Sequence, residues 1–545
     1  MLLNFIFILL FTGVMSFFAS QQRVSPAWTL LLGGAFAYSI LALMGITTSS
    51  DISVVWNAMP NLSIAVNLNP LQTSQTAALG IIIVCALSFY YNLLFFDNDK
   101  NALNGLVAII GVLSIIALCS TNYLQLLASV GMADVMIYSV INRYEAKRQY
   151  IYGNFFADFL LLNILAIILG QHGNIDIMSL DKYETDWHHR DYIAIMLLIC
   201  IFIKSGIVLF HTAYQKMSAL SLNRLNFILF AATPLLGIII LNILHGILNI
   251  SHYSFFLIKI FAVCTVLWGM AGALFVKGIK RKSAYMGMIF WGLSFCGFAW
   301  LPLFSQSTFF LFLVSALLFN VALALVKGNV PAFPCWKRCF HFRLIAPMLA
   351  SAVYIFAWWH FALSNLVLAL AGTTVLIFVT SHLVSDVLFS QKQVADNILP
   401  DYLRLFAYLP IIAEFIFITV FYPHLLPQWT YIVIMVVLWL AIFMINPLSK
   451  LKVMHNFEYI QTGDLISSMY DTLILAPLQI MGRILRLTID VVFLERTVIS
   501  SIKSAIRFMI FIFRRLHANS VLCSTVFMLL SIAIMVAAYY HGAVR

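Results

Sequence analysis

The chain has 545 residues, of which 63% are hydrophobic and only 9% are charged. Because soluble domains carry about a quarter charged residues, this composition excludes a soluble protein and predicts an integral membrane protein. The net charge of +11 could indicate an anionic partner, but its placement predicts membrane topology instead, and we expect a lipid bilayer and no nucleic acid as partner.

Apolar segments of spanning length, about twenty residues, recur about sixteen times and predict an all-α integral membrane fold. The first segment is followed directly by more spans and lacks a clear small-residue cleavage site, so we expect a retained helix and not a signal peptide. The predicted spans are 2–18, 28–43, 79–96, 106–119, 124–140, 152–169, 192–210, 227–247, 255–276, 285–303, 309–326, 344–361, 366–384, 402–422, 429–445 and 521–540.

Basic residues fall almost entirely in alternate connections between these spans, and the intervening connections carry only Lys182 and Arg190. The positive-inside rule then places the N-terminus outside and the connections after odd-numbered helices in the cytoplasm. We expect a multi-pass protein of a bacterial-type inner (plasma) membrane. In the first long outside connection, 49–75, Trp56, Pro60 and Pro70 indicate an ordered turn or a short strand.

The sequence motifs do not indicate redox, metal or nucleotide chemistry in this chain. Most of the eight cysteines lie in apolar segments and form no disulfide pattern. Cys335, Cys339 and His341 are a weak zinc spacing without a fourth ligand. We find no Walker loop, dinucleotide fingerprint or iron-sulfur spacing, so we expect no cofactor, no bound nucleotide and no catalytic centre in this chain.

Lys204 lies near the middle of the apolar stretch 195–212. A lone ammonium at that depth costs at least a few kcal/mol, so intramembrane lysines usually face a protein interior or a water-filled path. The alternative is that Lys204 pairs with a buried acid, or snorkels, and conducts nothing.

The stretch 465–515 differs from the spans because it is semi-apolar, helix-forming and rich in arginine. Four basic residues fall within a narrow arc of a helix and predict an amphipathic helix that lies along the membrane surface before the last span. The alternative is a kinked pair of poor transmembrane helices. The four residues are Arg496, Lys503, Arg507 and Arg514.

Three local motifs carry a family resemblance. The chain resembles the antiporter-like membrane subunits of respiratory complex I, closest to the distal subunit with a long lateral helix. Lys204-Ser205 followed by 209–212 looks like the family's lysine-bearing broken helix, and 230–233 looks like the next helix, usually His-Ala-Ala-Thr. The most specific match, 279–288, is similar to the family's Ile-Lys-Arg-x-x-Ala-Tyr-Ser signature. Weaker matches cover nearly the whole chain, and they include 67–71, 154–158, 469–471, 477 and 495–496.

The resemblance implies two inverted five-helix repeats with ion sites near the midplane. It divides the chain into N-terminal helices (1–104), a first repeat (105–250), a second repeat (251–390), C-terminal helices (391–463), a cytoplasmic lateral helix (464–516) and a terminal span (517–545). Lys280 is either a relay between the half-channels or an ordinary positive-inside residue. The implied proton path consists of Lys204, Lys280, Asp134, Asp158 and His211.

The departures from the family pattern matter as much as the matches. Asp134 is one position away from the family's glutamate that pairs with the lysine, and one position rotates a helical side chain by about 100°. Leu209 replaces the proline that breaks the lysine helix, which leaves the break without its usual cause. Phe230 replaces the histidine of the eighth helix. In the second repeat Asn320 replaces the central lysine, Phe312 and Ala316 replace histidines, and 344–361 lacks the family's helix break and retains only His360 as a titratable group.

Three functions follow from the resemblance. The first is an antiporter-like membrane-arm subunit of a proton-translocating, NADH:quinone oxidoreductase-type complex, a redox-driven pump, held among other integral membrane subunits. The second is a non-conducting scaffold paralogue. The third is the membrane subunit of a proton-driven inorganic-carbon transporter, against which the lateral helix argues.

Overall fold

The computed structural model describes most of the chain between residues 2 and 389 and four isolated positions beyond. The described residues are 2–18, 25–45, 52–59, 62–68, 72–94, 100–120, 122–172, 177, 190–208, 210–244, 247–248, 251, 253–276, 278–301, 306–327, 336–362, 364–389, 476, 480, 504 and 507. The chain forms two units, Met1–Tyr470 and Asp471–Arg545. The predicted spans 402–422, 429–445 and 521–540 lie outside the described residues, and so does the predicted lateral helix apart from the four isolated positions.

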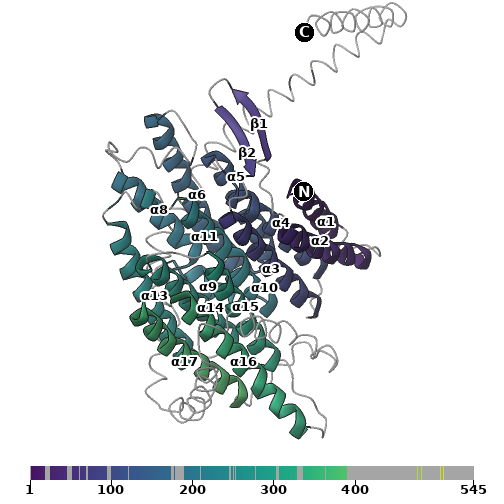
Figure 1. The fold of residues 1–545 in the computed structure, drawn as a ribbon, viewed down its shortest axis with the longest axis vertical. Coiled ribbons are helices and arrows are strands. Elements are labelled where there is room, and N and C mark those ends of the chain that lie inside the picture. Colours follow the sequence, from purple (N-terminus) through teal and green to yellow (C-terminus); the bar gives the residue numbers. More distant parts are fainter. Residues whose placement is uncertain are drawn as a thin grey trace, which may run out of the picture. The chain divides into compact units, whose positions relative to one another are not determined.

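The described part of the first unit is helical apart from one β-hairpin (Figure 1). Long apolar runs account for the length of these helices. The helices are α1 (Leu2–Phe18), α2 (Ser25–Gly45), α3 (Gln72–Leu94), α4 (Lys100–Leu118), α5 (Tyr123–Val140), α6 (Tyr144–His172), α8 (Arg190–Ser205), α9 (Thr212–Met217), α10 (Leu222–Phe227), the π-helix η2 (Ile228–Ala232), α11 (Thr233–Ile243), α13 (Ser254–Phe275), α14 (Ile279–Trp300), α15 (Gln306–Lys327), α16 (Trp336–Ala362) and α17 (Leu366–Phe389).

The connection between α2 and α3 contains two antiparallel strands, β1 (Ile52–Met59) and β2 (Leu62–Leu68). Ile52 pairs with Leu68 at the open end, and Met59 pairs with Leu62 beside the turn. This hairpin confirms the expectation of an ordered turn or short strand in 49–75.

Six described helical segments are long and apolar enough to cross a membrane by length and composition, which supports a multi-pass membrane protein. Large apolar side chains face outward on them, including Phe256, which is 62% exposed, and Val367, which is 78% exposed. Such outward apolar faces suit lipid. The segments are Ala27–Met44, Tyr123–Val140, Ala146–Gly170, Arg224–Leu241, Ser254–Leu274 and Val367–Val384. Shorter apolar helices are Ile6–Phe18, Ala77–Leu93, Ala102–Leu118 and Phe309–Leu323.

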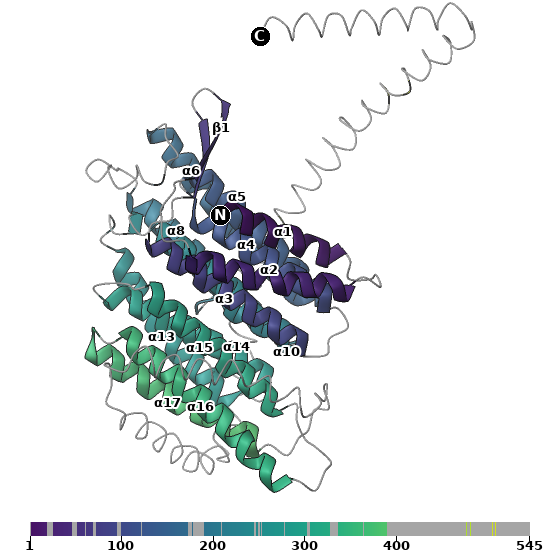
Figure 2. The same cartoon turned by 45° about the vertical axis from the view of Figure 1, so that its right-hand side comes forward.

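Small residues let α13 and α14 approach closely. A Cβ on Gly292 of α14 would lie 2.9 Å from the backbone nitrogen of Val266, and a Cβ on Gly269 of α13 would lie 3.1 Å from that of Ile289. Glycine is the residue that permits such backbone approach between membrane helices. α13 and α14 both contact α17, and Figure 2 shows the three helices in the same part of the molecule.

Candidate functional site

The helix that carries Lys204 is broken directly after it. α8 ends at Ser205, the backbone turns at Gly206, and α9 begins at Thr212. Gly206 has φ of +65°, a conformation that glycine adopts without a steric penalty. The break is therefore retained without the family's proline, because Gly206 reverses the backbone three positions before Leu209. The structure does not describe Leu209 itself.

Two side chains form hydrogen bonds with backbone groups that lose their helical partners at the break. The backbone N–H of Val208 donates to Thr265 Oγ1 of α13 at 3.2 Å. The hydroxyl of Tyr214 in α9 donates to the carbonyl oxygen of Lys204 at 2.6 Å. Irregular backbone at membrane depth is tolerated where protein groups replace the lost hydrogen bonds, so this break is a stable element of the fold.

Lys204 is 1% exposed and forms ion pairs with two aspartates from two other helices. Its ammonium donates to Asp134 Oδ2 of α5 and, at 2.8 Å, to Asp158 Oδ1 of α6. The one-residue shift of the acid therefore does not turn Asp134 away from Lys204. The structure brings together three of the five residues of the predicted path, and we call Lys204, Asp134 and Asp158 the ion cluster.

The ion cluster contains one cation and two carboxyl groups, so full ionisation leaves a net charge of −1 in the protein interior. Tyr150 stabilises the charge on Asp134 by donating its hydroxyl to Oδ1 at 2.8 Å. The Asp134 side chain is 7% exposed, whereas that of Asp158 is 25% exposed. A buried uncompensated charge is costly, and Asp158 is the more accessible of the two carboxyl groups.

His211 lies at the far side of the break, where it precedes α9. The indole N–H of Trp268 donates to His211 Nε2 at 3.1 Å. Nε2 therefore acts as an acceptor, and the neutral ring carries its proton on Nδ1. Nδ1 is buried and has no hydrogen-bond partner among the described residues, and the same holds for Ser205 Oγ. The break thus contains two buried polar atoms that can each make a further hydrogen bond.

Lys280, the fifth residue of the predicted path, is only half-buried in the first turn of α14, and it forms no ion pair among the described residues. The buried lysine of this segment is Lys282, which is 4% exposed and lies beside His382 of α17. Helical periodicity could have identified it. Ile279, Lys282 and Met286 follow the i, i+3, i+7 spacing of one buried face, whereas Lys280 lies about 200° from Lys282 around the helix.

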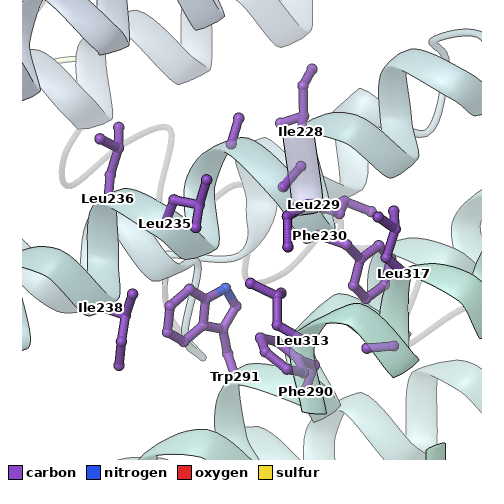
Figure 3. Packing of buried hydrophobic residues seen from close by; sticks show 14 of the residues in the cluster. Ile228, Leu229, Phe230, Leu235, Leu236, Ile238, Phe290, Trp291, Leu313 and Leu317 are labelled. Carbon is purple, nitrogen blue, oxygen red and sulfur yellow. The ribbon is translucent and has the colours of Figure 1, made fainter. Parts of the chain in front are cut away.

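Aromatic side chains fill the region where the family's histidines and second lysine would stand. Phe312 stacks on Phe290, Tyr354 and Phe361 with ring centroids 5.0, 5.1 and 6.0 Å apart. Phe230 lies in the π-helix η2 and packs edge-on to Phe290 at 6.4 Å. Figure 3 shows Phe230, Phe290 and Trp291 among leucine and isoleucine side chains. We call Phe230, Phe290, Phe312, Tyr354 and Phe361 the aromatic cluster.

Asn320, at the position where the resemblance expects a central lysine, does not open this region. Asn320 is 1% exposed, and its amide nitrogen donates back to the carbonyl of Ala316 in its own helix at 2.9 Å. α16 runs unbroken from Trp336 to Ala362, with Pro347 inside it, as expected from the loss of the family's helix break. Among the described residues, no group of three His, Cys, Asp or Glu side chains is placed to hold a metal ion.

The fold is shared with membrane subunits of known structure. A chain of the Mrp complex from Dietzia sp. DQ12-45-1b superimposes with a TM-score of 0.64 at 14% identity, over 86% of this chain and 59% of that chain. A chain of the membrane-bound sulfane sulfur reductase, an archaeal respiratory membrane complex, superimposes with a TM-score of 0.60 at 14% identity, over 75% of each chain. No protein-family model and no curated protein sequence matches. This chain spans about three fifths of the Mrp chain, and the likeness confirms the predicted resemblance at the level of the fold.

Proposed function

We propose that this protein is an antiporter-like, multi-pass membrane subunit whose proton-binding site is the ion cluster. The observation that carries the proposal is the buried ammonium of Lys204 between two carboxyl groups, directly before a helix break. Broken helices beside buried ionisable side chains are the arrangement by which membrane proteins place ion sites near the bilayer midplane.

A proton can be bound and released here by exchange among the three groups of the cluster. With both acids ionised, the net charge of −1 attracts a proton, which enters at the more exposed Asp158. Protonation of either carboxyl weakens its ion pair with Lys204 and leaves the other acid as the partner of the ammonium. A charge that arrives from a neighbouring site can then displace the proton, which is the basis of coupled translocation.

The proposed partners are other integral membrane subunits. Both structural neighbours are chains of membrane complexes, one an Mrp complex and the other an archaeal respiratory membrane complex. For this chain we propose a place in the membrane arm of a redox-driven complex related to NADH:quinone oxidoreductases. The two inverted repeats, the N-terminus outside, the bacterial-type inner membrane and a cytoplasmic lateral helix belong to the same proposal.

A second candidate function is a non-conducting scaffold, and the aromatic cluster favours it. Stacked phenylalanines exclude water and carry no proton, so a path through Phe230 and Phe312 toward Asn320 is blocked. In this function the ion cluster would hold α5, α6 and α8 together and conduct nothing. The two candidates differ in one measurable property, namely proton flux that depends on Lys204.

The test is proton flux in vesicles that contain the chain with the subunits that co-purify with it in mild detergent. We expect Lys204→Ala to abolish the flux. The matched control is Lys259→Ala, because Lys259 is a half-buried lysine of α13 that lies over the Trp300 ring, 5.6 Å from its centroid, outside the ion cluster. Flux that survives Lys204→Ala would leave the scaffold as the function. Co-purification of a peripheral zinc protein, without other membrane subunits, would instead support the inorganic-carbon transporter.

A further inference from the structure

Three basic side chains lie where the chain passes from α5 into α6. Arg143 directly precedes α6, and its carbonyl oxygen accepts the backbone N–H of Lys147 at 2.8 Å, so the two residues are one helical turn apart. Arg148 follows Lys147 in the helix. None of the three forms an ion pair among the described residues. We call Arg143, Lys147 and Arg148 the basic cluster.

The charge of this turn is not balanced locally. Residues 142–148 contain three cations and one acid, Glu145, so their net charge is +2 whichever cation that acid approaches. The side chain of Glu145 and the acids of the connection 95–99 lie outside the described residues. Arg224 of α10 brings a further cation to the inner side of the turn, where its Nη1 donates to the carbonyl oxygen of Val140 at 3.4 Å. The turn therefore presents a positive surface.

Two members of the basic cluster are placed to bind an anion with several oxygen atoms. Lys147 Nζ lies over the ring of Tyr138 in α5, 4.2 Å from its centroid, and the ring supplies no full negative charge. Arg148 is half-buried, and its Nε has no hydrogen-bond partner among the described residues. A guanidinium group carries five N–H donors in a planar fork that matches the oxygens of a phosphate group. A phosphate therefore fits this cluster in both charge and shape.

An exposed apolar stripe of α6 begins beside the basic cluster. Tyr144 is 76% exposed at the start of the stripe, and Arg148 lies on the same helix face one turn later. Tyrosine is enriched where a membrane helix passes from the headgroup region into the apolar core. The members of the stripe that follow Arg148 are Ile151, Phe155, Phe159 and Leu162, all of them exposed.

We propose that the basic cluster binds the phosphate of an anionic phospholipid, whose acyl chains lie along the apolar stripe of α6. Basic residues beside lipid-facing helices are the arrangement that binds anionic headgroups in membrane proteins. The occupant is a lipid and not a soluble phosphate, because the stripe provides a surface for acyl chains directly beside the cations. The bound lipid stabilises α6, the helix that also supplies Asp158 to the ion cluster.

The test is the thermal unfolding midpoint of the chain, purified in mild detergent with its co-purified subunits, at increasing concentrations of phosphatidylglycerol. We expect phosphatidylglycerol to raise the midpoint more than phosphatidylcholine with the same acyl chains, because only the former has a net negative charge. High salt should weaken this difference.

Arg148→Gln should require about fivefold more phosphatidylglycerol for half of the shift, the loss that corresponds to one basic residue near an anionic membrane surface. Arg143→Gln should act in the same way, and it is a second variant that is safe for folding, because Arg143 is exposed. The matched control is Arg281→Gln, an exposed arginine near the start of α14, which should stay within about twofold of the unsubstituted protein.

Four outcomes would overturn the lipid site. Equal shifts with phosphatidylglycerol and phosphatidylcholine would show that the headgroup charge is not recognised. Equal lipid dependence in Arg148→Gln, Arg143→Gln and Arg281→Gln would place the lipid elsewhere. A full shift with glycerol 3-phosphate would assign the cluster to a soluble phosphate. Loss of a co-purified subunit from both cluster variants would assign it to an acidic partner. Because the measurement requires no proton flux, failure of the proposed function would leave its result unchanged.

Discussion

The ring of Tyr214 occupies the space that a Cβ atom on Gly206 would need, while its hydroxyl donates to the carbonyl oxygen of Lys204. One tyrosine therefore both requires a glycine at the break and satisfies the backbone that the break exposes. The position of Lys204 depends on this contact, because the break begins two residues after it.

Gly206→Ala should destabilise the protein, since it adds a Cβ where φ is +65° and the Tyr214 ring already lies. The backbone conformation alone costs about 1–2 kcal/mol in an L-residue, and the contact adds to it. The measurement is the thermal unfolding midpoint in detergent. Gly34→Ala is the matched control, because a Cβ on Gly34 meets nothing within 4 Å. Equal midpoints for the two variants would contradict the account of the break.

Lys204 and Asp134 of the ion cluster should be energetically coupled, so that the costs of removing them are not additive. Lys204→Met leaves two acids without their cation, and Asp134→Asn removes one of its two acidic partners; breaking a buried pair costs about 3–5 kcal/mol. The double variant should cost less than the sum of the single variants, because it leaves only Asp158 without a cation, whereas Lys204→Met alone leaves both acids without one. Unfolding free energies of the four proteins form a double-mutant cycle, and additive values would show that the pair is not coupled.

Tyr150→Phe should reduce the stability of the protein but leave the ion pairs of Lys204 in place. It removes only the hydrogen bond that the Tyr150 hydroxyl donates to Asp134. A hydrogen bond to a charged group contributes about 1.5–3 kcal/mol to stability. We expect a loss in that range in unfolding experiments, together with a changed proton flux if the cluster conducts. Tyr138→Phe serves as the control, since its ring lies under the ammonium of Lys147 and Phe retains that contact. A Tyr150→Phe variant as stable as this control would contradict the assigned hydrogen bond.

Phe312→Ala should destabilise the protein by about 3–5 kcal/mol, the usual cost of deleting a buried phenylalanine. The ring contacts Phe290, Tyr354, Trp358 and Phe361, so the surrounding rigid rings cannot close the cavity completely. Phe256→Ala removes a ring of the same size from an exposed position of α13 and is the control. We expect Phe312→Ala to leave proton flux unchanged, because the cavity lacks proton carriers. A rise in flux would show that the aromatic cluster is a gate.

Sequence reasoning identified Lys204, because a charge within an apolar run of spanning length needs a partner, and the family resemblance supplied Asp134 and Asp158 as members of the path. It could not determine the side-chain direction of Asp134, since a shift of about 100° around α5 can be compensated by the rotation and tilt of the whole helix. It did not identify Gly206 as the cause of the break, because a single glycine is a weaker signal than a proline. It selected Lys280 from a family motif, although helical periodicity places Lys282 on the buried face.

The hairpin shows which part of a local structure the sequence predicts and which part it does not. Proline and tryptophan in 49–75 indicated order, but the register of β1 on β2 depends on backbone pairing that no residue pattern specifies. The replacement of the family's histidines was visible in the chain at once. The sequence does not tell whether these rings stack on one another or line a narrower path. Their stacking depends on the positions of α14, α15 and α16 relative to each other.

The ion cluster also affects how the chain enters the membrane during synthesis. Its two acids belong to α5 and α6, and the lysine belongs to α8, so the acids leave the ribosome first. A helix with a central lysine inserts poorly alone, since the unpaired charge costs about 2.5–3.5 kcal/mol at the helix centre. When α8 arrives, Asp134 and Asp158 are already available to neutralise that charge. We therefore expect α8 to insert efficiently only in chains that contain α5 and α6.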